Sequence, residues 1–393
     1  MRVLVMAPFE RGRGQGGSLR ATAIAERLED REVTVEWQVV RRRALGPVAK
    51  LRAARRGLPV LSALYAPPAT PAAAPDAILV AHSYLTPVVR RLTRGTPTVV
   101  DFHNLEWRHL LDGSPAGPAA GPPGPLRWLW TRDQARLMRR VEAAAVAGAD
   151  LSLFVSETEQ GWAQATVPGA ATRVAPSTLP AAVVRSAARI AAARDPRAGE
   201  LAYVGTLTFP TNVASLERFL TGVWPALRAA DAGLRLTVAG RCAPDVRERL
   251  ARHPGVTATG FLEDLTPLLS RCQAVVMPFE GAAGTSLRTI FYALAGLPVI
   301  GSPEAFRGMG FAAGVAADRP AAWIAALSSD GRAKAVAVAR AAQADARRLQ
   351  DDPGPWDALV AALEVMTRTG QARRARDGHV TRDGHAAPAV AAS

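Results

Sequence analysis

The sequence is poor in the residue types that define several common classes of protein. Its 393 residues include two cysteines, Cys242 and Cys272, too few for a disulfide framework or a four-thiolate zinc site. No apolar run reaches the roughly 18 residues that a membrane-spanning helix needs. The first residues have the pattern of a strand. Their apolar segment is shorter than that of a signal peptide. We therefore expect a cytoplasmic protein.

Lysine is scarce as well, with Lys50 and Lys334 the two examples among 48 basic residues. The formal net charge of +14 therefore comes almost entirely from arginine. A positive field favours nucleotide phosphates, acidic membranes or nucleic acid without choosing among them. No stripe of aromatic residues interleaved with arginine supports a nucleic-acid partner. Weak peripheral contact with a membrane, or else a solvated helix face, is suggested by one basic stretch: Arg41–Arg43, Lys50, Arg52, Arg55 and Arg56.

What the sequence does contain is apolar material for large cores, with 49% hydrophobic residues in a chain long enough for two domains. Short apolar runs alternate with helical patterns, as in parallel sheets wrapped by helices. The strands expected in the first half are residues 3–6, 33–40, 77–81, 98–102, 151–155 and 172–174. In the second half the expected strands are 201–204, 235–239, 256–259, 274–277 and 298–300, with helices near 212–230, 244–252, 264–271 and 284–295.

The fold class expected is therefore α/β, with two Rossmann-like domains. Residues 185–199 are rich in Ala and Arg and show no strand pattern, so we place the domain boundary there. Residues 112–125 are rich in Pro and Gly, and we expect a mobile loop. The tail contains RDGH twice, and a disordered tail is favoured there over a histidine metal pair. The division expected is a first domain at 1–185, a linker at 186–199, a second domain at 200–345, a helix at 355–370 and a disordered tail at 371–393.

A glycine loop follows the first strand. Gly16 and Gly17 permit close approach of the backbone, and the helix after them, for which Ser18 is a plausible N-cap, directs unpaired N–H groups at an anion. The spacing matches neither GxGxxG nor the P-loop pattern. A phosphate site and an ordinary tight turn remain equally open.

A polar cluster follows the strand at 98–102. Asp101, His103, Asn104 and Glu106 are ionisable or polar groups just past the carboxyl end of an apolar strand, where open α/β sheets bind ligands. Histidine titrates near neutrality and can hydrogen-bond a reacting hydroxyl. We favour a functional His103 and a structural, helix-capping Asn104.

A third cluster, at residues 278–288, ends a strand and begins a helix. Gly284 lets the backbone approach a ligand, and Thr285 and Ser286 offer hydroxyls and amides. Arg288, in the first helical turn, can form a bidentate contact with phosphate oxygens. Because an arginine at a helix N-terminus opposes the dipole, we favour an anion between them over a simply capped helix.

Motifs for other chemistries are missing from the sequence. It has no Asp-x-Asp, HExxH, paired CxxC or GxSxG pattern. We therefore expect no metal site and no cofactor.

These motifs resemble family 4 glycosyltransferases. In the second half the resemblance rests on an ordered set of segments: Tyr203-Val204-Gly205-Thr206-Leu207 with Asn212, Val238-Ala239-Gly240-Arg241, residues 260–265 (GFLEDL) and residues 284–300 (GTSLRTIFYALAGLPVI). In the first half, Gly16-Gly17, Phe102-His103 and Val155-Ser156-Glu157 match more loosely.

The resemblance implies a GT-B architecture, in which two Rossmann-like domains face each other across a cleft. It implies transfer of a sugar from a nucleotide-diphosphate co-substrate to a small-molecule or glycan acceptor, with retention of configuration and without a metal. The catalytic residues would be His103 and Arg288. The donor-binding residues would be Gly16, Gly17, Gly205, Thr206, Asn212, Arg241, Phe261, Leu262, Gly284, Thr285, Ser286, Leu287 and Phe291. The acceptor side would include Asp101, Asn104, Glu106 and Trp107.

The sequence departs from the family at three places. The turn after residue 204 lacks the usual Arg and Lys, and Arg288 stands where many relatives have lysine. Phe291 occupies the position of the glutamate that usually binds the donor ribose, and Ser177 that of a common asparagine. These departures leave a non-catalytic GT-B binding or auxiliary protein as the alternative. Trp107, Trp128 and Trp130 could wall an acceptor site, although core packing is the commoner use of such residues.

Overall fold

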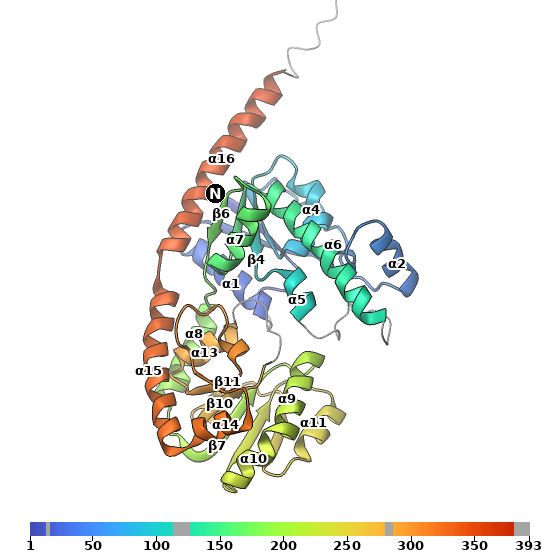
Figure 1. The fold of residues 1–393 in the computed structure, drawn as a ribbon. Coiled ribbons are helices and arrows are strands. Elements are labelled where there is room, and N and C mark those ends of the chain that lie inside the picture. The colour runs from blue at the N-terminus through green and yellow to red at the C-terminus, as the bar shows by residue number, and fades with distance from the viewer. Residues whose placement is uncertain (13–15, 113–125, 280–285, 381–393) are drawn as a thin grey trace, which may run out of the picture.

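The computed structural model describes residues 1–12, 16–112, 126–279 and 286–380. The chain forms two α/β domains joined end to end, and its last helix returns along the first domain (Figure 1). Gly284 and Thr285, the loop at 113–125 and the second RDGH segment lie outside the described residues. Each domain is built on a parallel sheet, as the alternating pattern predicted.

The first sheet has the strand order β2-β1-β3-β4-β5-β6. Its strands are short apolar runs, and those in the middle are buried on both faces, as parallel strands covered by helices must be. The strands are β1 (Arg2–Ala7), β2 (Thr34–Val39), β3 (Ala77–Ala81), β4 (Thr98–Phe102), β5 (Leu151–Phe154) and β6 (Thr172–Val174). The helices around them are α1 (Gly16–Glu29), α2 (Pro47–Arg55), α3 (Val60–Ala63), α4 (Thr86–Thr93), α5 (Glu106–Asp112), α6 (Leu126–Gly148) and α7 (Glu157–Thr166), with a 3-10 turn at Ser83–Leu85.

The second sheet has the order β12-β11-β10-β7-β8-β9. Its strands are β7 (Arg197–Val204), β8 (Arg235–Ala239), β9 (Val256–Gly260), β10 (Cys272–Met277), β11 (Val299–Gly301) and β12 (Val315–Ala316). Its helices are α8 (Ala181–Ala192), α9 (Pro210–Gly222), α10 (Trp224–Ala230), α11 (Pro244–Ala251), α12 (Thr266–Leu269), α13 (Leu287–Leu294), α14 (Pro320–Leu327) and α15 (Ser329–Asp351), with a 3-10 turn at Pro303–Phe306.

The segment expected to be a linker is ordered secondary structure. Helix α8 covers the first half of it, to Ala192, and β7 begins within it, at Arg197. Ala187 and Ile190, three residues apart on one face of α8, are buried in the core of the second domain. The sequence analysis missed this helix because its apolar stripe consists mostly of alanine.

Two other helices differ from the expectation. The helix near 212–230 is two helices, α9 and α10, with Pro225 near the start of the second. Ser18 does not cap α1, which begins at Gly16; its hydroxyl donates to the carbonyl oxygen of Glu10 at 3.1 Å instead.

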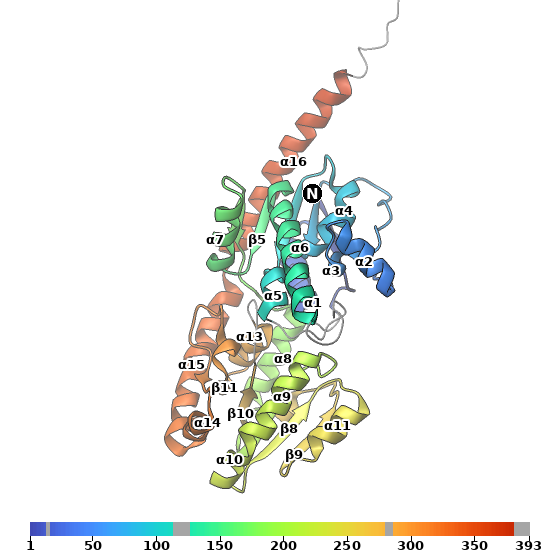
Figure 2. The ribbon, with the colours of Figure 1, turned by 45° about the vertical axis from the view of Figure 1, so that its right-hand side comes forward.

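The last helix, α16 (Gly354–Val380), joins the two domains. Trp356, Leu359 and Leu363 are buried in the core beneath α1 of the first domain, although α15 before them packs on the second. Near the end of α15, Gln350 exchanges two hydrogen bonds of 2.9 Å with the backbone of Leu179. The helix continues to Val380, so residues 371–380 are helical and not part of a disordered tail. Figure 2 shows α16 running beside the first domain.

Candidate active site

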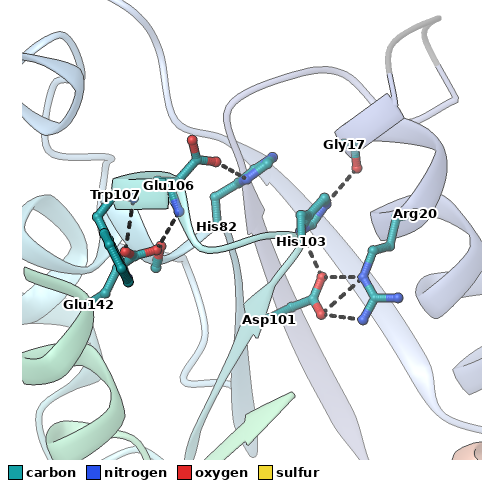
Figure 3. Close-up of polar contacts among 9 residues, drawn as sticks. Gly17, Arg20, His82, Asp101, His103, Glu106, Trp107 and Glu142 are labelled. Carbon is teal, nitrogen blue, oxygen red and sulfur yellow. Dashed lines mark hydrogen bonds and ion pairs between the residues drawn. The ribbon is translucent and has the colours of Figure 1, made fainter. Parts of the chain in front are cut away.

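His103 is held from both sides just past the end of β4. Its Nδ1 lies 2.8 Å from Oδ2 of Asp101, and its Nε2 lies 2.8 Å from the carbonyl oxygen of Gly17 (Figure 3). Both partners are oxygen atoms, so the ring is fixed between two acceptors. The strand end and the glycine loop, which the sequence analysis treated as separate clusters, therefore form one site.

Asp101 is fixed in turn by Arg20 of α1. The guanidinium makes a bidentate contact with the carboxylate, with Nη2–Oδ1 at 2.7 Å and Nε–Oδ2 at 3.1 Å. Both side chains are at most 2% exposed. Burial acts to raise the pKa of Asp101, but the charges of Arg20 and His103 outweigh it and hold the pKa well below its usual range. Asp101 therefore orients His103, and no surface of it remains for the acceptor contact expected from the sequence.

The turn after β6 also reaches this pair. Ser177 is buried and accepts a hydrogen bond from Arg20 Nη1 at 3.3 Å. The position that carries asparagine in the resembled family thus serves here as a third acceptor for the buried guanidinium.

His82, which the sequence analysis did not single out, belongs to the same site. Its imidazole stacks on that of His103 and on the ring of Tyr84, with centroid distances of 3.8 and 4.7 Å. Its backbone has φ +94°, a conformation that side-chain-bearing residues rarely adopt. Burial and the charge of His103 lower the pKa of His82 to about 4, so it is a neutral ring at neutral pH.

Gly17 is required by the two imidazoles. A Cβ at this position would lie 2.6 Å from Nε2 of His82 and 3.3 Å from Cδ2 of His103. No side chain fits without moving a ring, so the glycine serves close packing against the site. Gly16 is different, since among the described residues the nearest atom to a Cβ there would be Leu287 Cδ1, at 3.9 Å.

Helix α5 is capped by a side chain from another helix. Glu142 of α6 accepts the backbone N–H groups of Glu106 and Trp107 at 2.9 and 3.2 Å, and the hydroxyl of Ser83 at 3.0 Å. Asn104 was expected to cap this helix and does not; its buried Oδ1 has no hydrogen-bond partner among the described residues. Burial and the charge of Glu106 raise the pKa of Glu142 to about 8.

Glu106 stands between His82 and Glu142. Its Oε1 lies 3.7 Å from Nδ1 of His82. Burial acts to raise the pKa of Glu106, but its contact with His82 and the charges of nearby histidines more than offset this, and its pKa is lowered. Glu106 is thus an ionised carboxylate that contacts His82, the imidazole stacked on His103.

The three tryptophans expected near the acceptor do not form a common wall. Trp107 and Trp130 pack partly buried against the first domain's core. Trp128 points outward and is 60% exposed. The indole Nε1 of Trp107 is buried without a hydrogen-bond partner in the part of the chain that the structure describes.

In the second domain, Arg288 lies over the end of the sheet. Its Nη1 donates to the carbonyl oxygen of Val204, the last residue of β7, at 3.1 Å. The guanidinium lies 4.3 Å from the ring centroid of Phe279, just past β10. Ser286 caps the helix by accepting from the N–H of Thr289 at 3.4 Å. The cation therefore stands at the carboxyl ends of two neighbouring strands, where α/β folds bind ligands.

Two motif glycines in this domain allow this packing. A Cβ on Gly205 would lie 2.5 Å from Nη1 of Arg288, and one on Gly240 would overlap the carbonyl oxygen of Gly205. The backbone after β7 thus packs directly against that after β8 and beneath Arg288. Asn212 closes the turn, because its Nδ2 donates to the carbonyl oxygen of Thr206 at 2.9 Å.

The remaining expected donor residues lie around the same sheet edge. Arg241 and Phe261 face each other, with 5.4 Å between guanidinium carbon and ring centroid, and line a pocket of about 320 Å³. Leu262 directly follows Phe261. Phe291 on α13 packs against the second domain's core and lies edge-on to Tyr292, with centroids 5.7 Å apart. The phenyl group of Phe291 therefore lies where the resembled family usually has the glutamate that binds the donor ribose.

Solved structures resemble this arrangement over nearly the whole chain. HepE from Anabaena, in complex with UDP-glucose, matches with a TM-score of 0.54 at 15% identity, covering 95% of this chain and 100% of HepE. Sucrose-phosphate synthase from Thermosynechococcus elongatus matches with a TM-score of 0.59 at 16% identity, covering 96% and 100%. The chain has the GT-B fold.

A sequence comparison adds a family match over part of the chain. Residues 198–336 match the family model described as "Glycosyl transferases group 1". A search of curated proteins found no match. Together with the GT-B neighbours, the family match supports a glycosyltransferase.

Within the GT-B frame, the start of α1 in the first domain lies close to the start of α13 in the second, because a Cβ on Gly16 would be 3.9 Å from Leu287 Cδ1. His103, which contacts Gly17, and Arg288, which follows Leu287, are therefore each next to this approach between the domains. In the described residues no group of His, Cys, Asp or Glu is placed to hold a metal ion. None of the helices in the described ranges combines the length and apolar character of a membrane span.

Proposed function

We propose that the chain is a retaining glycosyltransferase that moves a sugar, of the hexosyl or a related type, from a nucleotide-diphosphate donor to an acceptor. Retention and metal-independent transfer are the properties that the family resemblance implies. The observation that carries the proposal is the pairing of a held imidazole, His103, with a cation at a strand end, Arg288. HepE and a transferase from Siraitia grosvenorii, the latter matching at TM-score 0.50 and 13% identity over 94% of this chain and all of its own, were solved with UDP-glucose and UDP.

On the donor side, Arg288 and the start of α13 supply positive charge. The first N–H groups of a helix have no intrahelical acceptor and carry the positive end of the dipole. A leaving nucleoside diphosphate gains negative charge as its bond to the sugar breaks. Arg288 is placed to stabilise that charge and to replace the Arg and Lys that relatives carry after the first strand of this domain.

In the first domain, the described contacts orient one atom that faces the transferred sugar. Asp101 holds Nδ1 of His103, so Nε2 is the ring nitrogen available to a hydroxyl of the transferred sugar in place of the Gly17 carbonyl. Asn104 and Trp107, which follow His103 closely in the chain, are partly exposed, and we assign them to the acceptor, a small molecule or a glycan.

A direct test begins with a thermal-shift screen against UDP, GDP, dTDP and ADP and their sugars. A donor that raises the unfolding midpoint is then incubated with the protein, and products are followed by nuclear magnetic resonance, which reads the anomeric configuration. Retained configuration in a transfer or hydrolysis product supports the proposal, and an inverted product contradicts it.

The alternative is a GT-B protein that binds nucleotide without catalysis. Phe291 favours it, because a phenyl ring packed against the core supplies no acceptor for ribose hydroxyls. Binding of a nucleotide in the screen without any product would establish this alternative.

A further inference from the structure

Helix α2 lies on the surface with apolar and basic side chains on its outer face. The structure describes this helix in full, and none of its residues is buried. Val48 is 70% exposed and Leu51, one turn later, is 47% exposed. Arg52 and Arg55 are exposed on the same side of the helix. Contiguous exposed apolar side chains of this kind usually mark an interaction site.

The face continues onto the first turns of α6. Helix α3, which follows α2, is tied to α6 by a 2.8 Å hydrogen bond from the Val60 N–H to Gln134. In Figure 1 the start of α6 and α2 both lie on the right-hand side of the first domain; in Figure 2, turned to bring that side forward, α6 lies in front and α2 to its right. Trp128 and Leu129 are 60% and 55% exposed there, and Arg132 lies 4.6 Å over the indole ring. We call this surface, made of Val48, Leu51, Arg52, Arg55, Trp128, Leu129 and Arg132, the α2–α6 face.

The charge around this face is almost entirely positive. Between Glu36 and Asp76 the sequence contains no acidic residue but seven basic ones. In the first part of α6, residues 126–140, Asp133 is the one acidic residue among five exposed arginines. Arginines and aliphatic side chains that share one exposed face complement a surface with anionic headgroups above an apolar interior.

We propose that the α2–α6 face docks on an anionic lipid membrane. The arginines contact lipid phosphates, and Val48, Leu51 and Leu129 enter the boundary between headgroups and acyl chains. Trp128 has the apolar ring and polar N–H that suit this boundary. Nucleic acid would use the arginines and stack on the tryptophan, but it offers no apolar layer to the aliphatic side chains. The proposal does not rest on the proposed function, since it requires neither donor nor acceptor.

The test is co-sedimentation of the full chain with vesicles of equal parts phosphatidylglycerol and phosphatidylcholine, and with vesicles of phosphatidylcholine alone. We expect binding to the anionic vesicles that weakens with salt, and no binding to the neutral ones. The double variant Arg52→Gln/Arg55→Gln should bind about 25-fold more weakly, at about fivefold per cation. Val48→Ser/Leu51→Ser should bind about tenfold more weakly at unchanged charge.

A matched control changes the same chemistry on another face. Val336, 40% exposed, and Arg340 lie on α15 of the second domain, and Val336→Ser/Arg340→Gln should bind like the wild type. Membrane contact should also shift tryptophan emission to shorter wavelength, and Trp128→Phe should remove that shift. Because α2 has no buried residue, the α2 variants should keep the wild-type unfolding midpoint.

Three outcomes would overturn the proposal. One is equal binding to neutral and anionic vesicles. Another is an equal loss in the α15 control. The third is a combination of two results. The protein binds single-stranded RNA and Arg52→Gln/Arg55→Gln abolishes that binding, while Val48→Ser/Leu51→Ser changes neither RNA binding nor vesicle binding. This combination would identify the face as a nucleic-acid surface.

Discussion

The imidazole of His82 stacks on that of His103 with 3.8 Å between ring centroids and 22° between ring planes. His103 is held in addition by Asp101 and Gly17, so its ring is restrained at both nitrogens and on one face. A ring restrained in this way presents Nε2 in a fixed direction, which is what a contact with one substrate hydroxyl requires.

The state of His82 predicts a pH dependence of stability. Its pKa falls from 6.5 to about 4 on folding, mainly through burial, so between these values the unfolded chain binds a proton that the folded chain does not. Lowering the pH through this window should therefore destabilise the wild type by up to about 3 kcal/mol more than His82→Asn, which cannot titrate and tolerates a positive φ. Urea unfolding of both proteins measures this difference. Parallel pH curves would contradict the assignment.

The glycine loop predicts unequal effects of two neighbouring substitutions. Gly17→Ala places a methyl group 2.6 Å from His82 Nε2 and should lower turnover about 100-fold by displacing the imidazoles. Gly16→Ala meets only Leu287 Cδ1, at van der Waals distance, and should stay within about threefold of the wild type. Steady-state kinetics compares them. Equal rates for the two variants would show that Gly17 is an ordinary turn residue.

The buried ion pair predicts a large cost of removing one partner. Arg20→Met leaves Asp101 charged and buried and should lower the free energy of unfolding by about 3–5 kcal/mol. The control is Arg11→Gln, which breaks the exposed pair with Glu29 and should cost less than about 1 kcal/mol. Urea unfolding gives both values. Similar losses of unfolding free energy in the two variants would mean that the buried pair stabilises the fold no more than the exposed one does.

The held imidazole predicts a separation between turnover and donor affinity. His103→Ala removes the imidazole that we propose contacts the transferred sugar and should lower kcat at least about 100-fold. The dissociation constant of the nucleotide should change less than about threefold, because the diphosphate is bound by the other domain. Calorimetry and initial rates give the two quantities. Unchanged turnover would exclude His103 from catalysis.

The strand-end cation predicts a loss of nucleotide affinity. Arg288→Ala removes a charged hydrogen-bond donor worth about 1.5–3 kcal/mol, so diphosphate binding should weaken about 10- to 150-fold. Arg235→Ala, at the opposite end of the sheet on the first residue of β8, serves as the control and should bind normally. Calorimetry with the nucleotide found in the screen measures both. Normal affinity in Arg288→Ala would place the diphosphate elsewhere.

Several strands could be predicted from the sequence alone with their bounds. Ala77–Ala81, Thr98–Phe102, Thr172–Val174 and Arg235–Ala239 are confirmed. The first two are buried throughout, because a parallel strand covered on both faces needs a short apolar run that ends where polar residues begin. Helix α8 was missed, since alanine contributes little to an apolar stripe until a neighbouring strand buries it.

The candidate site was predictable only in part. Asp101 and His103 stand directly after a recognisable strand, and this position marks them in the sequence. Arg20 lies 81 residues from Asp101 along the chain, inside an amphipathic helix where an arginine usually faces water. No local pattern indicates that its charge is buried and paired.

The sequence by itself determined the two α/β halves, the strand ends at which polar residues gather, and the scarcity of lysine that makes the chain's charge a property of arginine. The tertiary structure alone decided three contacts. His82 adopts a positive φ and stacks on His103, Glu142 of α6 caps the separate helix α5, and the last helix packs against the first domain. The reason is physical: composition and periodicity encode which side chains leave water, whereas these contacts join atoms far apart in the chain, and they exist only after the sheets have brought their loops together.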